Sequence, residues 1–351
     1  MPLLDNYLME MLSRGGSDLH LITDLPPKIR VHGQLEPLNN EPIDRDMMET
    51  LLREVCPEER WKRYLECHDL DFAHEITGIA RFRCNYLYNF FGKAAVFRQI
   101  PSRILTIEDL KLPLVLKKIC TIPSGLVCVT GPTGSGKSTT LAAMVDFINS
   151  NSAKHIITIE DPIEFVHQNK KSTIIHREVG VHCDTFAHGL RSAMRSDPDI
   201  VLIGEMRDLE TIRLALTCAT MGMLVFATLH TNNAPKTIDR IIDAFPANEQ
   251  SQIKTMLAES LQAVVSQLLC RTADDKGRVA CHEILLWTDG LPNTIREGQV
   301  ATIRTIIEGN KGMGMCSMDS NLQELVNTGR ITGEEAYMKA SDKKFFQHYI
   351  E

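Results

Sequence analysis

The most specific chemical pattern in the sequence is a glycine-rich segment, GPTGSGKS at residues 131–138. It follows a strand-like apolar run and precedes a helical stretch, as a phosphate-binding loop does. Its glycines let backbone N–H groups point at phosphate oxygens, and the helix N-terminus adds partial positive charge. Lys137 would reach the β- and γ-phosphates, and the Ser138 hydroxyl would bind Mg²⁺. We expect ATP to contact Gly131, Pro132, Thr133, Gly134, Ser135, Gly136, Lys137, Ser138 and Thr139.

Two other apolar runs end in side chains suited to phosphoryl transfer. Glu205 follows the run at 199–203, and His230 follows the run at 224–229. Open α/β sheets bind ligands at the carboxyl ends of their strands. Glu205 at that edge could orient or deprotonate a water that attacks the γ-phosphate. A single histidine is more often structural, but beside these motifs His230 is better interpreted as a γ-phosphate sensor.

Three carboxylates follow the apolar run at 155–159, namely Glu160, Asp161 and Glu164. Clustered carboxylates repel one another unless a cation shares the site. Magnesium prefers oxygen ligands and keeps several waters. The pattern therefore predicts an acidic box on the Mg²⁺ side of the nucleotide, with a polar loop as the simpler alternative.

Residues 77–106 contain no Asp or Glu but several basic side chains. Arg81 and Arg83 are two residues apart, so on a strand they share a face. Paired guanidinium groups suit a polyphosphate. They could reach a nucleotide across a domain or subunit boundary, as an arginine finger does, although a solvated basic strand is the alternative. The basic residues of this segment are Arg81, Arg83, Lys93, Arg98 and Arg103.

Hydrophobic periodicity divides the chain into two parts that would position these residues. Residues 1–100 read as a small α+β domain, and residues 101–113 as a linker. In residues 114–351, strands that are apolar at successive positions follow one another with helices in between. This pattern predicts an α/β, doubly wound core. From about residue 248 the pattern reads as mostly helical.

Composition narrows the class of protein. Lys and Arg number 38 and Asp and Glu 45, which gives a net charge of −7 and disfavours a surface that tracks nucleic acid as a whole. Hydrophobic residues make up 43%, as in globular proteins. We expect no signal peptide and no transmembrane segment. The ten cysteines form no CxxC pair, so we expect reduced thiols in a cytoplasmic protein rather than a zinc site.

Four motifs taken together resemble those of the type II/type IV secretion ATPase superfamily. They are the Walker A segment GPTGSGKSTTLAA, the Asp box TIEDPIE, the Walker B segment DPDIVLIGEMRDLET and the His box ATLHTN. Within the superfamily the chain resembles the type IV pilus retraction ATPases, the PilT-like proteins. Its RGGSDLHL, GIARFRCN and AVFRQIP segments resemble that family's small PAS-like domain.

The resemblance implies a RecA-like P-loop NTPase core with a PAS-like N-terminal domain, assembled as a homohexamer that hydrolyses ATP to retract pili in twitching motility. The implied catalytic residues are Glu205, Glu164 and His230, with arginines Arg81, Arg83 and Arg98 acting in trans. Ser138, Glu160 and Asp161 would hold Mg²⁺, partly through water. An inner-membrane pilus platform protein, and a paralogous pilus ATPase, are implied partners at the inner face of the bacterial inner membrane. The absence of a tetracysteine site and of an extra N-terminal domain favours retraction over assembly.

One segment departs from the family pattern. PilT-like proteins typically carry AIRNLIRE where this chain has GLPNTIRE at residues 290–297, so Pro292 replaces an arginine. The departure leaves open an accessory ring subunit that supports another retraction motor, or a type II/IV secretion ATPase. A RecA-like nucleic-acid motor is disfavoured because aromatic residues are only 6% and the Asp and His boxes have no role in it.

Overall fold

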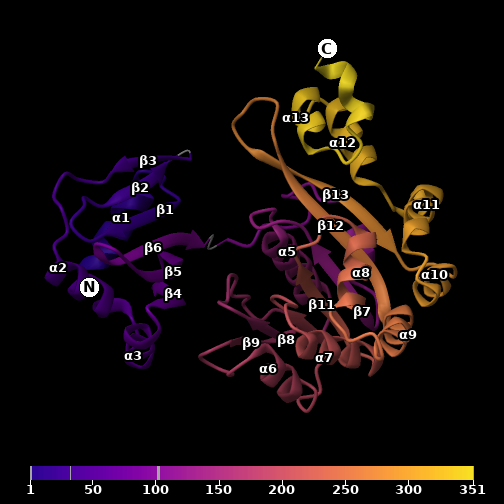
Figure 1. Ribbon diagram of the computed structural model, residues 1–351, viewed down its shortest axis with the longest axis horizontal. Coiled ribbons are helices and arrows are strands. Elements are labelled where there is room, and N and C mark those ends of the chain that lie inside the picture. The colour runs from indigo at the N-terminus through magenta and orange to yellow at the C-terminus, as the bar shows by residue number, and fades with distance from the viewer. Residues whose placement is uncertain (1, 32, 101–102, 351) are drawn as a thin grey trace. The chain divides into compact units, whose positions relative to one another are not determined.

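The computed structural model describes residues 2–31, 33–100 and 103–350, which form two compact units (Figure 1). The first unit runs to Arg103 and also takes in Asp161–Phe165. The second comprises Ile104–Glu160 and the chain from Val166 onward. Residues 101 and 102 of the expected linker lie outside the described residues, and the remainder of that linker from Ile104 belongs to the second unit.

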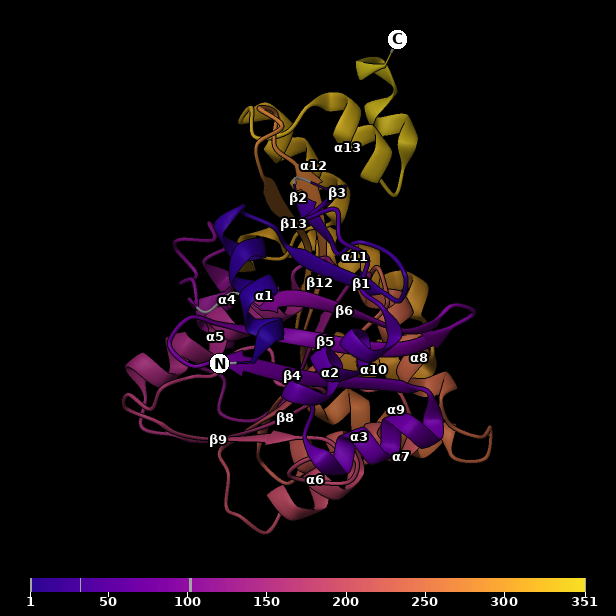
Figure 2. The ribbon, with the colours of Figure 1, turned by 90° about the vertical axis from the view of Figure 1, so that its left-hand side faces the viewer.

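The first unit is a six-stranded antiparallel sheet packed against helices. Its strands are β1 (Asp18–Ile22), β2 (Lys28–Val31), β3 (Gln34–Pro37), β4 (Asp69–Ile76), β5 (Ala80–Asn89) and β6 (Gly92–Ile100). Its helices are α1 (Leu3–Ser13), α2 (Arg45–Val55) and α3 (Glu58–Cys67). The strand order is β3-β2-β1-β6-β5-β4, and Figure 2 shows strands β1, β6, β5 and β4 side by side.

Alternation along β5 separates the two faces of this sheet. Phe82 and Tyr86 are fully buried and pack with the helices in a single core. The intervening Arg81 and Arg83 are only half-buried, because successive side chains of a strand point to opposite faces. The sequence alternation thus gives the first unit an apolar face and an arginine-bearing face.

The second unit is a seven-stranded sheet of order β13-β12-β7-β11-β10-β8-β9. All neighbouring strands are parallel except the β12–β13 pair. The strands are β7 (Gly125–Thr130), β8 (His155–Glu160), β9 (Thr173–Glu178), β10 (Ile200–Ile203), β11 (Leu224–Leu229), β12 (Leu261–Arg271) and β13 (Arg278–Leu286). The helices are α4 (Val115–Ile119), α5 (Lys137–Asn151), α6 (Phe186–Ala193), α7 (Leu209–Thr220), α8 (Ala234–Asp243), α9 (Gln250–Ser260), α10 (Leu291–Glu297), α11 (Ile303–Gly309), α12 (Met318–Asn327) and α13 (Gly333–Lys339).

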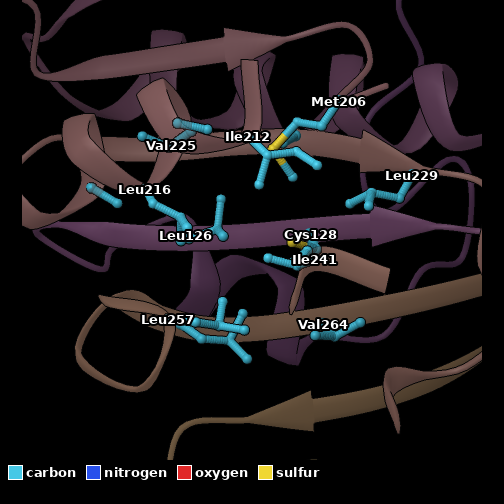
Figure 3. Packing of buried hydrophobic residues seen from close by; sticks show 14 of the residues in the cluster. Leu126, Cys128, Met206, Ile212, Leu216, Val225, Leu229, Ile241, Leu257 and Val264 are labelled. Atoms are coloured by element: carbon cyan, nitrogen blue, oxygen red, sulfur yellow. The ribbon is translucent and has the colours of Figure 1, made fainter. Parts of the chain in front are cut away.

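Both faces of this sheet are covered, which explains its unalternating apolar strands. Leu126 and Cys128 of β7 pack into a cluster with residues of α6–α9 (Figure 3). Val127 and Val129 of the same strand pack on the other face with residues of α4 and α5. A strand buried on both sides needs apolar residues at every position. The expected doubly wound α/β core is confirmed.

The region from residue 248 is less helical than the sequence analysis predicts. After α9, the chain forms β12 and β13, which pair over Ala263–Leu286, and becomes helical only from α10. Strand β12, LQAVVSQLLCR, is apolar on both faces, so its periodicity does not distinguish a buried strand from a buried helix. Among the described residues, none of the helices is long and apolar enough to cross a lipid bilayer.

Candidate active site

The glycine-rich loop connects β7 to α5 and lies tightly against β12. Gly131 has φ of +146°, and a Cβ atom there would come within 2.2 Å of the Gln267 carbonyl oxygen. Gly136 has φ of +84°, and a Cβ atom there would lie 2.9 Å from Gln267 Nε2. Both positions therefore require glycine, for backbone conformation and for space. The expected strand–loop–helix context of the motif is confirmed.

Lys137 folds back across this loop. Its Nζ donates hydrogen bonds to the carbonyl oxygens of Gly131 at 2.8 Å and Pro132 at 3.0 Å. The hydroxyl of Ser135 is buried and has no hydrogen-bond partner within the described part of the chain. A cavity of about 290 Å³ opens on Pro132–Ser135. A buried ammonium and an unpaired hydroxyl beside a cavity suit the phosphates of a nucleotide.

A buried polar network centred on Gln267 of β12 holds the phosphate-binding loop, and the sequence analysis missed it. Gln267 Nε2 donates to the Ser135 carbonyl oxygen at 2.6 Å, and Gln267 Oε1 accepts from Thr140 Oγ1 at 2.7 Å. His282 Nε2 lies 3.1 Å from the same Gln267 oxygen. Burial, with a smaller effect from Arg330, lowers the pKa of His282 to about 4, so the ring is neutral at pH 7. Gln267 thus ties β12 to the loop.

We expect Gln267→Leu to weaken ATP binding by about tenfold and to destabilise the fold by about 1–3 kcal/mol. The substitution leaves the Ser135 carbonyl and the Thr140 hydroxyl buried without their partner. Isothermal titration calorimetry and thermal melting measure the two effects. Gln262→Leu is the matched control, because Gln262 lies on the same strand and its side chain makes no hydrogen bond that the structure describes. Unchanged ATP affinity in Gln267→Leu would show that the loop does not depend on this network.

Glu205 and His230 meet at the carboxyl ends of neighbouring parallel strands, as the sequence analysis expects. Glu205 Oε1 lies 3.0 Å from His230 Nε2. The other oxygen, Oε2, lies 2.6 Å from the guanidinium of Arg207, a partner that the sequence analysis did not single out. Backbone hydrogen bonds fix the residues on either side of Glu205: Gly204 N donates to the carbonyl oxygen of Ile159 on β8 at 2.8 Å, and Met206 N donates to that of Thr228 on β11 at 3.0 Å.

The electrostatics of Glu205 favour a charged carboxylate. Burial alone would raise its pKa, but Arg207, His230 and Lys137 together lower the pKa below its ordinary value. Glu205 is therefore ionised at neutral pH and able to accept a proton. Lys137 is the smallest of these three contributions, and it indicates that the phosphate-binding loop lies within electrostatic range of the Glu205 carboxylate.

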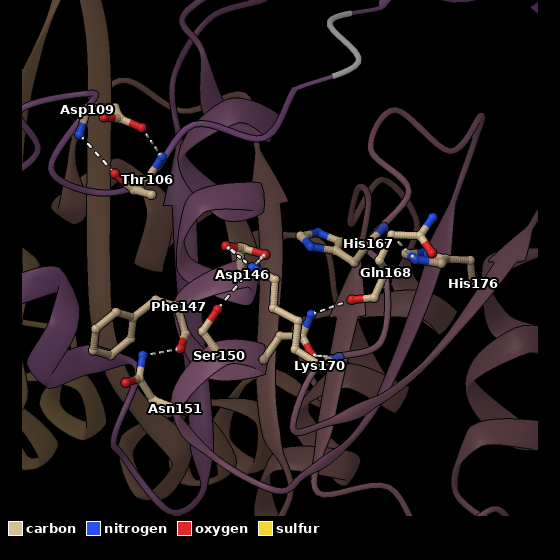
Figure 4. A network of polar contacts seen from close by, with 11 residues as sticks. Thr106, Asp109, Asp146, Phe147, Ser150, Asn151, His167, Gln168, Lys170 and His176 are labelled. Carbon is tan, nitrogen blue, oxygen red and sulfur yellow. Dashed lines mark hydrogen bonds and ion pairs between the residues drawn. The ribbon is translucent and has the colours of Figure 1, made fainter. Parts of the chain in front are cut away.

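Glu160, at the end of β8, lies one strand away from Glu205. Its Oε1 is 4.0 Å from His176 Nδ1. The His176 ring stacks on His167 with centroids 5.8 Å apart, and its Nε2 accepts from the His167 backbone N–H at 3.1 Å (Figure 4). His176, which lies beside Glu160, is thus itself held by the segment before β9.

The other two acids of the expected box, Asp161 and Glu164, follow Glu160 closely in the chain. Asp161 and Glu164 belong to the segment grouped with the first unit, whereas Glu160 belongs to the second. Within residues 2–31, 33–100 and 103–350, no three His, Cys, Asp or Glu side chains gather as ligands for one metal ion. Ser138 and Thr139 lie half-buried in the first turn of α5, beside the loop.

The three arginines lie together on one face of the first unit's sheet. Arg83 on β5 is directly opposite Arg98 on β6, and Arg81 is two residues along on the same face. Each has a carboxylate nearby on an adjoining strand. The pairs are Arg98 with Asp18 at 2.7 Å, Arg81 with Glu75 at 3.7 Å and Arg83 with Asp71 at 3.8 Å. The segment at residues 77–106 contains no acid of its own, so its arginines pair with carboxylates on neighbouring strands of the sheet.

Comparison with known proteins identifies relatives along nearly the entire chain. The family model described as "Type II/IV secretion system protein" matches residues 1–348. The chain is 50% identical over 329 residues to the Pseudomonas aeruginosa "Type IV pilus retractation ATPase PilT", covering 93% of this chain and 95% of that protein. It is 49% identical over 318 residues to a Neisseria gonorrhoeae "Twitching motility protein", covering 91% of this chain and 85% of that protein.

A solved structure agrees with these relatives. The crystal structure of the pilus retraction motor PilT with bound ADP matches with a TM-score of 0.89 and 39% identity, and covers 99% of both chains. Sequence motifs, fold and relatives all point to the same group of nucleotide-hydrolysing proteins. The chain therefore belongs to the type II/IV secretion system protein family and, within it, to the PilT-like ATPases.

Proposed function

We propose that this chain is a ring-forming motor that hydrolyses ATP to drive retraction of a type IV pilus. The observation that carries the proposal is the pairing of Glu205 Oε1 with His230 Nε2 at 3.0 Å, where β10 and β11 end; β11 lies beside β7, the strand that leads into the phosphate-binding loop. Relatives named for pilus retraction and twitching motility support the same motor function.

In this proposal each side chain has a defined task in the attack of water on the γ-phosphate. The loop N–H groups and Lys137 hold the β- and γ-phosphates. Glu205 orients the attacking water and accepts its proton. His230, bonded to Glu205, contacts the γ-phosphate when it is present. The products are ADP and phosphate, and Arg207 keeps Glu205 charged between turnovers.

Ser138, Glu160 and Asp161 would hold Mg²⁺, partly through water, with Glu164 completing the acidic side. Hydroxyl and carboxylate oxygens are the hard ligands that Mg²⁺ takes, so the donor set fits the ion. When bound, Mg²⁺ would neutralise negative charge on the β- and γ-phosphates. The residues themselves supply the orientation of the phosphate chain.

The assembly that we propose is a homohexamer in which Arg81, Arg83 and Arg98 of one subunit serve the nucleotide of its neighbour. The support is their common face on the first unit's sheet and the weak pairing of Arg83 and Arg81 with their carboxylates. We place the ring on the cytoplasmic side of the bacterial inner membrane, where a pilus platform protein would receive the force.

The second candidate is an accessory ring subunit, suggested by Pro292. In the structure Pro292 lies in the first turn of α10, where a proline costs no helical hydrogen bond. Asn293 and Arg296 of that helix remain in contact at 3.3 Å. The proline therefore leaves the helix intact, so the departure from the family pattern is the loss of the arginine side chain and not of the helix.

Measurement of ATP hydrolysis by the purified chain alone separates the two candidates. A motor is expected to turn over ATP with Mg²⁺ at a rate far above that of Lys137→Ala, because the variant lacks the ammonium that holds the phosphates. An accessory scaffold would hydrolyse ATP no faster than Lys137→Ala does. That second result would contradict the proposal.

A further inference from the structure

Glu283, on β13, is a buried acid to which none of the steps proposed for ATP hydrolysis assigns a task. The residue is only 6% exposed, and burial raises the pKa of its carboxyl group. Burying an acidic side chain costs free energy unless hydrogen bonds compensate for the lost water. An apolar residue of similar volume would fill the same space at no such cost. The partners of Glu283 therefore indicate what the acid does.

The hydrogen-bond partner of Glu283 is the first residue of α8. Glu283 Oε1 accepts from the backbone N–H of Ala234 at 2.8 Å. Ala234 is fully buried, and the first N–H groups of a helix have no partner within the helix. Helix α8 lies against β12 and β13 (Figure 1). Glu283 thus fixes the point at which α8 begins relative to β13.

His230 lies just ahead of that point in the chain. It follows β11, and only residues 231–233 separate it from α8. This short segment is itself tied to the helix, because Thr231 Oγ1 lies 2.7 Å from Thr237 Oγ1. A displacement of the start of α8 would therefore move His230, whose Nε2 lies 3.0 Å from Glu205 Oε1.

The segment that leads into α12 holds β13 on both sides of Glu283. Cys281 Sγ donates to the carbonyl oxygen of Met318 at 3.7 Å, and Ile284 N donates to that of Cys316 at 2.8 Å. The Met318 backbone amide also acts to lower the pKa of Glu283, so the carboxyl group lies close to the first residues of both α8 and α12. Glu283 is thus held in place itself while it holds α8.

Neighbouring residues of β13 contact different parts of the site. His282 lies beside Gln267, which holds the phosphate-binding loop. Glu283 points to the opposite face of the sheet, since successive side chains of a strand alternate, and there it contacts α8. The support of the loop and the support of His230 are therefore separate side chains.

We propose that Glu283 is a positioning residue for ATP hydrolysis, whose carboxyl group holds the start of α8 so that His230 stays against Glu205. Glu283 itself does not touch the nucleotide. This inference rests on the proposed function, because it assigns Glu283 a task within the ATP-hydrolysing site.

The test compares Glu283→Ala with the wild-type chain in steady-state hydrolysis and in ATP binding. We expect kcat to fall by roughly tenfold to a hundredfold through displacement of His230, whereas the Kd for ATP changes less than about threefold because the loop keeps its support. Glu283→Gln keeps an oxygen that accepts from Ala234 N, so it should retain most of the wild-type kcat. Glu308→Ala on α11 removes an exposed acid and is the matched control, with wild-type kcat expected.

A double-mutant cycle shows whether Glu283 acts through His230. In a His230→Ala background, Glu283→Ala should lower kcat by less than about twofold, since the group that it positions is already absent. Losses of kcat that multiply in the double variant would overturn the inference, because a purely structural defect acts independently of His230. An equal loss of kcat in Glu283→Gln, or a parallel loss of ATP binding, would overturn it as well.

Thermal melting of each variant establishes that it folds. If Glu283→Ala does not fold, Glu283→Asp takes its place in the same cycle, because the shorter side chain keeps the acid but does not reach Ala234 N. Absence of hydrolysis by the wild-type chain would contradict the proposed function and this inference with it. Wild-type turnover by Glu283→Ala would contradict the inference alone.

Discussion

Replacing Arg83 with alanine is expected to slow ATP hydrolysis by roughly 10³–10⁵-fold, the effect of removing an arginine that stabilises transition-state charge. Arg83 shares a sheet face with Arg98 and lies 3.8 Å from Asp71, a partially exposed partner that holds it weakly. Its loss therefore leaves no buried carboxylate unpaired. Steady-state phosphate release measures the effect, and Arg63→Ala on α3 of the same unit is the matched control, with wild-type activity expected.

Mixing variants tests whether the arginine acts on a neighbouring subunit. Arg83→Ala and Lys137→Ala are each expected to be inactive alone. A mixed ring, however, places the intact loop of one variant beside the intact arginine of the other, so hydrolysis should partly return. If mixing restores nothing while both variants still assemble, Arg83 does not act in trans.

Glu205→Gln is expected to lower the rate of hydrolysis by roughly 10²–10⁴-fold while ATP still binds. Glutamine keeps the size of the side chain but cannot accept the proton of the attacking water. Because the pKa of Glu205 is held low, the wild-type group is charged at neutral pH, and the substitution removes that charge. Single-turnover hydrolysis and nucleotide binding separate the chemical step from affinity.

The control for this substitution is Glu259→Gln, which changes an exposed carboxylate on α9. It should hydrolyse ATP as the wild type does. A Glu205→Gln variant with normal turnover would remove Glu205 from the mechanism.

The sequence predicts correctly those strands whose pattern of apolar residues matches the burial of their side chains in the structure. β7, β8, β10 and β11 are apolar at nearly every position and are separated by helices, so a parallel two-sided sheet is the direct interpretation. β12 is largely apolar too, but it contains Ser266 and Gln267 and follows a helix without a turn residue. Its pairing with β7 brings together residues far apart in the sequence. Local periodicity carries no information on that pairing.

The same limit applies to the candidate site. Glu205 and His230 could be placed together because the ends of parallel strands share one edge of the sheet. Gln267 was missed because it lies on a strand that was interpreted as helix, and its role depends on the distant Ser135 and Thr140. The pairing of Arg98 with Asp18 depends on β1 lying beside β6, which the sequence does not reveal.

The measurement that tests the central claim most directly is piliation and twitching of a strain deleted for this gene and complemented with wild-type or Glu205→Gln protein. A retraction motor predicts that the deletion strain and the Glu205→Gln strain carry surface pili in excess and do not twitch, and that the wild-type gene restores motility. Loss of surface pili in the deletion strain would contradict the account, because it would show that the protein extends pili rather than retracts them.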